Sequence, residues 1–220
     1  MIFIINKNAN AYNTNNFLGR KNKTIFSVLI LQLEKRIIEY FIGIGKTTVC
    51  KKIAFALEKK GSRFDGFYTE EVRDQRGSRI GFDIVRVKDP GNRLSLAKLT
   101  STDAPNKSSP RYQVGNYHVF RDNFETIALP ILDLDTDILL IDEIGKMELF
   151  SEDFKKKIMN IFFDSPKKAF VIGTIPQIHK TPQRHAELFE KLHADKGIKI
   201  LKVTRGNRND LPEEIIRYFS

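Results

Sequence analysis

Residues 43–48 read Gly-Ile-Gly-Lys-Thr-Thr, between an apolar run over residues 36–42 and an amphipathic stretch over residues 46–60. Glycines before a helix let backbone N–H groups curl round an anion, and the helix start adds the positive end of its dipole. In such a loop a lysine reaches the β and γ phosphates of a nucleotide and the next hydroxyl binds Mg²⁺. The string predicts a phosphate-binding loop made by Gly43, Ile44, Gly45, Lys46, Thr47 and Thr48, with Lys46 and Thr47 in those two roles.

The loop departs from the complete pattern GxxxxGK[ST] at its first position, where this chain has Tyr40 instead of glycine. The first glycine lets the chain leave the strand sharply, and a tyrosine replaces it only where the backbone angles suit a residue with a Cβ. Taken alone, residues 43–48 also fit a chance glycine turn before a helix.

A second string supports the first. Residues 137–143 read Asp-Ile-Leu-Leu-Ile-Asp-Glu, an apolar strand that ends in two acids. A strand end beside a phosphate loop is where the second Mg²⁺ ligand lies, so we expect Asp142 to hold the ion directly or through water. Glu143 is expected to polarise the attacking water, which favours hydrolysis over transfer to a bulky acceptor. For either acid alone, a solvated turn is the alternative.

Two other features belong to the same predicted sheet edge. Thr174 ends the next apolar run, and its hydroxyl is expected either to sense the γ-phosphate or to cap the following turn. Residues 204–208 form a polar loop after the last strand, where contact with a base or ribose and simple solvation are equal alternatives.

The wider pattern alternates short apolar runs with helical stretches, which is typical of an α/β protein with a mostly parallel central sheet flanked by helices. A turn-rich gap at residues 74–78 predicts an antiparallel hairpin inserted in that sheet. Residues 88–110 are predicted to form an irregular loop with one short strand near Leu94. Strands are expected at 36–42, 64–73, 79–87, 137–141, 168–174 and 199–203, and helices at 46–60, 123–132, 152–163, 184–193 and 211–219.

From residue 43 to the C-terminus the chain resembles the cancer-related nucleoside-triphosphatases, a family with archaeal, bacterial and eukaryotic members. The shared strings are GIGKTT (43–48), DGFYTEEVR (65–73), RIGFDIV (79–85), VGNY (114–117), LLIDEIGKMELFS (139–151), GTIP (173–176) and the Asn-Arg pair 207–208. The resemblance implies a P-loop fold related to the RecA-like ATPases and Mg²⁺-dependent hydrolysis of nucleoside 5′-triphosphates. The family's roles carry over to Lys46, Thr47, Asp142 and Glu143. No role follows for Tyr68, Glu70 or Arg73, whereas Lys146 and Glu148 either reach the substrate or start the next helix.

The chain departs from the family in two places. Its loop usually begins Gly-Pro-Pro-Gly where this chain has Tyr40 to Gly43, and it tends to glutamate where Gly206 stands. One hypothesis is that residues 1 to about 42 are a mistaken gene model that lacks the true first exon. The rival hypothesis is a real variant with weak or no activity.

The N-terminal region has its own composition. Residues 1–33 contain four basic residues, no acidic one and many asparagines, so residues 1–35 are predicted to be a disordered tail or an artefact, followed by a P-loop domain over 36–220. The apolar runs are too short for a secretory signal or a membrane span. A single cysteine, Cys50, favours a reducing compartment, so we expect the cytoplasm, with a mitochondrial transit peptide as the alternative. The four histidines show no metal-ligand spacing.

The net charge of +10 and the pI near 9.6 favour anionic partners. Three functions fit: a nucleoside-triphosphate hydrolase, a nucleotide or nucleoside kinase with its lid in residues 88–111, and a degenerate P-loop protein that binds nucleic acid. Because no nucleic-acid-binding motif is present, we expect no specific nucleic acid as a partner. We expect nucleoside triphosphates as ligands, no membrane association and a monomer.

Overall fold

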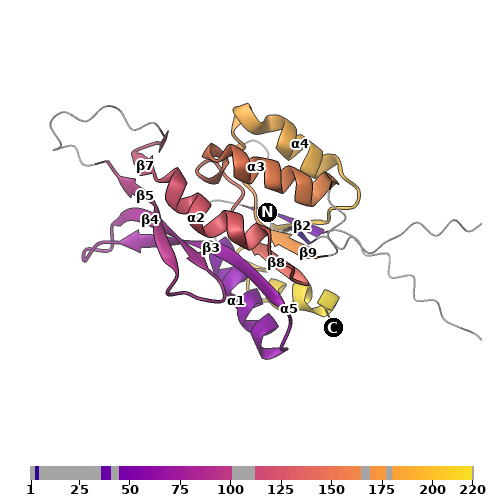
Figure 1. Ribbon diagram of the computed structural model, residues 1–220. Coiled ribbons are helices and arrows are strands. Elements are labelled where there is room, and N and C mark those ends of the chain that lie inside the picture. The colour runs from indigo at the N-terminus through magenta and orange to yellow at the C-terminus, as the bar shows by residue number, and fades with distance from the viewer. Residues whose placement is uncertain are drawn as a thin grey trace, which may run out of the picture.

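A computed structural model describes residues 3–4, 36–40, 45–100, 112–164, 169–176 and 180–219, of which 3–4, 36–40 and 219 are described by their backbone alone. Most strands belong to a seven-stranded sheet in the order β6-β7-β5-β4-β3-β8-β9 (Figure 1). Its members are β3 (Phe64–Arg73), β4 (Arg79–Arg86), β5 (Arg93–Leu99), β6 (Gln113–Val114), β7 (Tyr117–Val119), β8 (Ile138–Ile141) and β9 (Phe170–Gly173). A three-stranded sheet contains β1 (Phe3–Ile4), β2 (Arg36–Tyr40) and β10 (Ile200–Val203), and its β1 contacts β9.

The helices are α1 (Lys46–Lys59), α2 (Arg121–Leu132), α3 (Glu152–Met159), α4 (Ala186–Ala194) and α5 (Leu211–Ile216). Short helical turns are η1 (Glu148–Phe150), η4 (Gln183–His185), η5 (Arg217–Phe219) and η2 (Asn160–Asp164), a π-helical turn that continues α3. In the part of the chain that the structure describes, no helix has the length and apolar character to cross a bilayer.

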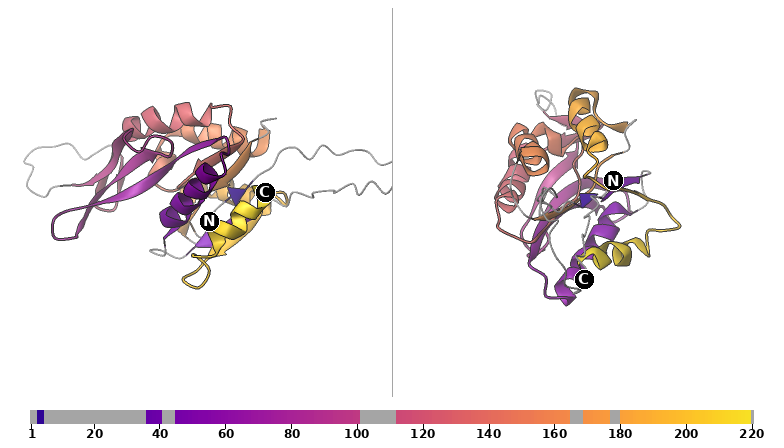
Figure 2. Two further views of the ribbon diagram at one scale, coloured as in Figure 1. Left: turned by 90° about the horizontal axis from the view of Figure 1, so that it is seen from below. Right: turned by 90° about the vertical axis from the view of Figure 1, so that its right-hand side faces the viewer.

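The helices cover the sheet from both sides, with α2 and α3 on one face and α1 and α5 on the other (Figure 2). Side chains of β8 alternate between these faces, as the pleat requires. Leu139 and Ile141 belong to the core beneath α2, α3 and α4, whereas Ile138 and Leu140 belong to the core beneath α1 and α5. Because β8 is buried on both faces, all four of its residues are apolar.

The parallel strands end at a common edge. In the registers of β3 with β8 and of β8 with β9, Ile141 lies opposite both Phe67 and Gly173. The residues that follow β8 and β9, Asp142 and Thr174, therefore come out side by side at this edge.

The predicted α/β fold class is confirmed, but the central sheet is mixed and not mostly parallel, because its antiparallel part is larger than the hairpin that the sequence predicted. The strands of that hairpin, β3 and β4, are followed by β5, β7 and β6, all paired antiparallel. The strand expected near Leu94 is seven residues long, from Arg93 to Leu99. A bulge at Leu96 places it and Ala97 in the core together, which breaks the alternation that identifies a strand.

The remaining elements lie close to their expected positions. The helix expected at 152–163 is divided into α3 and η2, and the helix expected at 184–193 corresponds to η4 and α4. The β6–β7 hairpin, with Gly115 in its turn at φ +56°, was not predicted. Apart from residues 3–4, the predicted tail 1–35 lies outside the described residues, so the proposed domain boundary stays a prediction.

Candidate active site

The start of α1 lies against the end of β8. The Thr47 hydroxyl donates a hydrogen bond to Asp142 Oδ2 at 2.7 Å, and Lys46 Nζ lies 2.5 Å from Glu143 Oε2. Two adjacent residues of the helix thus contact two adjacent residues of the strand end. The four residues to which the sequence assigned phosphate, metal and water chemistry lie together in the structure.

Gly45 precedes α1 in the left-handed conformation, with φ +96°. A Cβ there would lie 3.5 Å from Thr48, an ordinary contact, so the requirement for glycine is conformational and not spatial. The first helical hydrogen bond runs from Val49 N–H to the Gly45 carbonyl at 2.9 Å. The amides of residues 46–48 therefore precede the helical ladder, as at helix starts that bind anions. Gly43 and Ile44 lie outside the described residues.

Asp142 is buried, and hydroxyl groups from two elements bind its carboxylate. Thr47 binds Oδ2, and Thr174 donates to Oδ1 at 2.8 Å. Burial raises the pKa of Asp142 above its ordinary value and the neighbouring charge of Glu143 adds to this effect, while Lys46 and the two hydroxyls oppose it. The result is a buried carboxylate that hydroxyls orient.

Lys46 is a largely buried cation at the centre of this cluster, with 14% of its side chain exposed. Burial alone would lower its pKa, but the negative charges of Glu143 and Asp142 outweigh that effect and the pKa is raised. Lys46 therefore keeps its charge near neutral pH, as a residue that binds phosphate oxygens requires.

The sequence left the roles of Thr174 and Asn207 undecided, and their hydrogen bonds in the structure indicate these roles. Thr174 is fully buried, and its hydroxyl orients Asp142. Asn207 stabilises its own loop, because its side chain accepts a hydrogen bond from the Thr204 amide at 2.7 Å and donates one to the Lys202 carbonyl at 2.8 Å.

An ion-pair network beside the site was missed by sequence reasoning. Lys51, one helical turn after Thr47, forms an ion pair with Glu70 of β3. Glu70 also binds Arg93 of β5, with 2.9 Å between Oε2 and Nη1. The network ties α1 to the antiparallel part of the sheet. The family string at 65–73 contained Glu70, but only the fold shows its partners.

Two further residues of that string, Tyr68 and Arg73, have contacts of their own. The Lys51 ammonium lies 4.5 Å from the centre of the Tyr68 ring. Arg73 donates to the Gly77 carbonyl at 2.7 Å and so stabilises the turn between β3 and β4.

The residues after the acid pair differ in burial. Lys146 is exposed. Glu148 is only 5% exposed, and burial together with the charge of Glu143 raises its pKa to about 8. The sequence left the role of Glu148 open because a glutamate at a helix start is usually solvated.

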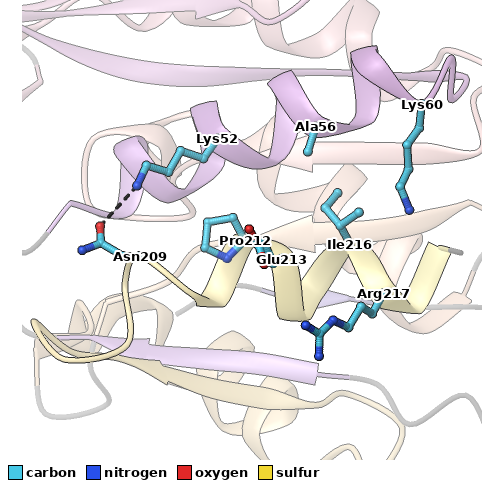
Figure 3. A pocket seen from close by; sticks show the side chains of 8 residues that line it. All are labelled: Lys52, Ala56, Lys60, Asn209, Pro212, Glu213, Ile216 and Arg217. Carbon is cyan, nitrogen blue, oxygen red and sulfur yellow. Dashed lines mark hydrogen bonds between the residues drawn. The ribbon is translucent and has the colours of Figure 1, made fainter.

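A groove of about 400 Å³ lies between α1 and α5, away from the acid pair (Figure 3). Its ends carry charged and polar groups, and at one of them Lys52 donates to Asn209 Oδ1 at 3.2 Å. None of the predicted site residues lines it. The lining residues are Lys52, Ala56, Lys60, Asn209, Pro212, Glu213, Ile216 and Arg217.

A Gly-Lys-Thr helix start that contacts a strand-end Asp-Glu pair, at the edge of parallel strands covered by helices, defines the class of P-loop nucleotide-binding proteins. The comparisons with known proteins narrow the class. A family model described as NTPase matches residues 37–216. The bovine cancer-related nucleoside-triphosphatase homolog is 40% identical over 183 residues, which cover 80% of this chain and 91% of the relative.

Two solved structures share the fold. The crystal structure of THEP1 from Aquifex aeolicus has a TM-score of 0.63 at 32% identity and covers 83% of this chain and 96% of its own. The solution structure of a human cancer-related nucleoside triphosphatase has a TM-score of 0.65 at 36% identity and covers 84% and 97%. The chain belongs to this nucleoside-triphosphatase family, which confirms the resemblance inferred from its motifs.

Proposed function

We propose that this protein hydrolyses nucleoside 5′-triphosphates, ATP and GTP among them, to nucleoside diphosphate and phosphate, with Mg²⁺ as cofactor. The observation that carries the proposal is the contact of Lys46 and Thr47 with Glu143 and Asp142. Its relatives are named nucleoside-triphosphatases, which supports the same chemistry here.

The phosphates bind at the start of α1. Backbone amides of the loop formed by Gly43, Ile44, Gly45, Lys46, Thr47 and Thr48 surround the phosphate oxygens, and the helix dipole favours their charge. The Lys46 ammonium binds the β and γ phosphates. Since Lys46 is paired with Glu143, nucleotide binding replaces that carboxylate by phosphate oxygens as the partner of the ammonium.

Thr47 and Asp142 are the residues that would hold Mg²⁺. Both offer oxygen atoms, the donors that this ion prefers, and both belong to one hydrogen-bonded cluster at the sheet edge. The buried Asp142 carboxylate, with its raised pKa, gains from a nearby divalent cation. When bound, Mg²⁺ neutralises charge on the β and γ phosphates.

Glu143 activates the attacking water. Its carboxylate accepts a proton as the water oxygen bonds to the γ-phosphorus, and the bond from that phosphorus to the β–γ bridging oxygen breaks. The products are the nucleoside diphosphate, which keeps the bridging oxygen, and inorganic phosphate. Lys46 stabilises the negative charge that remains on the transferred group and on the leaving diphosphate.

We extend the proposal to the whole chain. Residues 36–220 form the P-loop domain and residues 1–35 an N-terminal tail, of which residues 3–4 pair with β2. The protein acts as a cytoplasmic monomer and binds no specific nucleic acid. The charge that remains after the basic N-terminal stretch suits a polyphosphate substrate.

The Glu143→Gln variant tests the role of the base, because glutamine has the size of glutamate but accepts no proton. We expect kcat with Mg²⁺-ATP to fall about 100-fold or more while the nucleotide Kd is retained, measured by chromatography of ADP and by calorimetry. The exposed Glu190→Gln is the matched control. An unchanged kcat refutes the assignment of Glu143, and a phosphorylated acceptor in place of free phosphate would favour the kinase.

A further inference from the structure

Glu148 is a buried carboxyl group that the proposed hydrolysis does not use. It begins η1, six residues after Asp142, and it is 5% exposed. Glutamate is rarely this buried without a partner that satisfies it, so its contacts indicate its role.

Its partner is the backbone of the turn that follows the acid pair. Glu148 Oε2 accepts a hydrogen bond from the Gly145 amide at 3.1 Å. The Leu149 amide donates to the Gly145 carbonyl at 3.1 Å, so both polar groups of Gly145 are bound by the start of η1. On the preceding side, the Ile144 amide donates to the Thr174 carbonyl at 2.7 Å. The backbone between Glu143 and Glu148 is therefore fixed from both sides.

Gly145 lies between the two carboxyl groups. A Cβ built on it would lie 2.9 Å from Glu148 Oε2, 3.1 Å from Glu143 Cγ and 3.2 Å from Glu143 Oε1. These distances are shorter than ordinary van der Waals contact, and the Cγ is part of the stem that places the Glu143 carboxylate. A Cβ at this position would therefore shift the Glu148 carboxyl group and press on the side chain of Glu143.

We propose that Glu148 is a positioning residue for Glu143. By holding the Gly145 amide, Glu148 fixes the turn that follows β8. Because Gly145 has no side chain, this turn leaves room for the Glu143 carboxylate beside Lys46. This inference rests on the proposed role of Glu143 in hydrolysis. Glu148 acts through Gly145 and is not in contact with the reacting atoms.

The charge state of Glu148 fits this role. Burial and the charge of Glu143 raise its pKa to about 8, so it is largely neutral at pH 7. A neutral acid still offers a carbonyl oxygen to the Gly145 amide, and it adds no full negative charge to a cluster that already contains Asp142 and Glu143. Glutamine reproduces this state, with an acceptor oxygen and no charge.

The test compares two substitutions of similar volume. Glu148→Gln keeps the acceptor, and Glu148→Met removes it. We expect Glu148→Met to lower kcat for Mg²⁺-ATP about 100-fold, the cost of a catalytic group misplaced by about 1 Å, with the nucleotide Kd unchanged. Glu148→Gln restores kcat to near the wild-type value. Glu190→Met, at an exposed site, is the control.

A double variant separates positioning from general damage. In the Glu143→Gln background, Glu148→Met should lower kcat no further, because the residue it positions no longer acts. A full additional loss there, or wild-type kcat in Glu148→Met alone, overturns the inference.

If circular dichroism shows that Glu148→Met does not fold, Gly145→Ala tests the same geometry with Glu148 intact. We expect a lower kcat at unchanged nucleotide Kd, and wild-type turnover overturns the inference. An unchanged kcat in Glu143→Gln refutes the proposed function itself. A loss in Glu143→Gln with none in the other variants refutes only the positioning role.

Discussion

At the scale of single residues, the site is a set of buried and partly buried ionisable groups. Burial and neighbouring charges shift the pKa values of Lys46, Asp142 and Glu148, and the Glu143 carboxylate contributes to each of these shifts. Two hydroxyls bind Asp142, a backbone amide binds Glu148 and the Lys46 ammonium binds Glu143. Each carboxyl group therefore has a partner suited to its charge, which is the condition for burying such groups at a tolerable cost.

The raised pKa of Glu148 predicts a pH dependence of stability. Its folded value of about 8 lies above the ordinary value of 4.5, so between these pH values the folded protein holds a proton that the unfolded chain releases. The contribution of Glu148 to the free energy of unfolding is fully present below pH 4.5 and is lost as pH rises through 8, with a slope of at most about 1.4 kcal/mol per pH unit.

The glutamine side chain in Glu148→Gln does not titrate. The free energy of unfolding of this variant should therefore increase relative to that of the wild type as pH rises from 5 to 8. Urea denaturation at several pH values measures the difference, with Glu190→Gln as the control. If the free energies of unfolding of wild type and Glu148→Gln changed with pH in the same way, the raised pKa of Glu148 would be contradicted.

The sequence predicted the residues whose chemistry is tied to a motif, and not those whose role depends on burial. Lys46, Thr47, Asp142 and Glu143 stand at motif positions, and the structure places them in contact. That Glu148 is buried against Gly145 depends on the path of the turn after β8, which no local pattern specifies. The same holds for Glu70, whose partners come from α1 and β5.

At the scale of elements, α3 shows how one cap fixes a helix that carries core residues. Ser151 is fully buried, and its hydroxyl accepts a hydrogen bond from the Phe154 amide at 3.0 Å. Phe154 in turn lies edge-on against Phe67 and Phe124, with ring centres 6.1 and 4.9 Å away. The cap therefore joins the turn after the acid pair to the core on one face of the sheet.

Ser151→Ala should lower the free energy of unfolding by about 1–2 kcal/mol, because it removes the cap and leaves the Phe154 amide unpaired in a buried place. Chemical denaturation followed by circular dichroism measures the change. Ser78→Ala, at an exposed turn, should stay within about 0.5 kcal/mol of the wild type. Equal stability of the two variants would mean that the cap contributes nothing.

Elements with regular periodicity were predicted from the sequence, and those with interrupted periodicity were not. The amphipathic pattern of α1 and the apolar run of β8 gave their positions to within one residue. In β5, the bulge at Leu96 and the neighbouring proline and glycine hid the full length of seven residues, so only a short strand near Leu94 was predicted. The hairpin of β6 and β7 has strands of two and three residues, too short for periodicity to identify.

At the scale of the whole molecule, the site lies where the two cores meet at one edge of the sheet. α1 belongs to the core on one face, whereas η1 supplies Leu149 to the core on the other. β8 contributes to both and ends in Asp142 and Glu143. Packing on both faces thus fixes the acid pair relative to the phosphate loop.

Replacing Tyr40, which stands where the phosphate-loop pattern has its first glycine, tests whether this residue limits activity. We expect Tyr40→Gly to raise kcat/KM for Mg²⁺-ATP, because glycine lets the chain leave β2 with the backbone angles that a phosphate loop uses. Phosphate release under steady-state conditions measures it, and Tyr40→Phe, which keeps the Cβ and the ring, should behave as the wild type. Equal activity of all three proteins would show that this loop tolerates an aromatic residue at its first position.

Phosphate release from Mg²⁺-ATP and Mg²⁺-GTP by the wild type and by Lys46→Ala tests the proposed function most directly. Lys46 is the cation that is paired with Glu143 at the site, so its removal should abolish release from both nucleotides. Lys59→Ala, at the far end of the same helix, should leave release unchanged. Release by Lys46→Ala at the wild-type rate, or no release by the wild type, would contradict hydrolysis at this site.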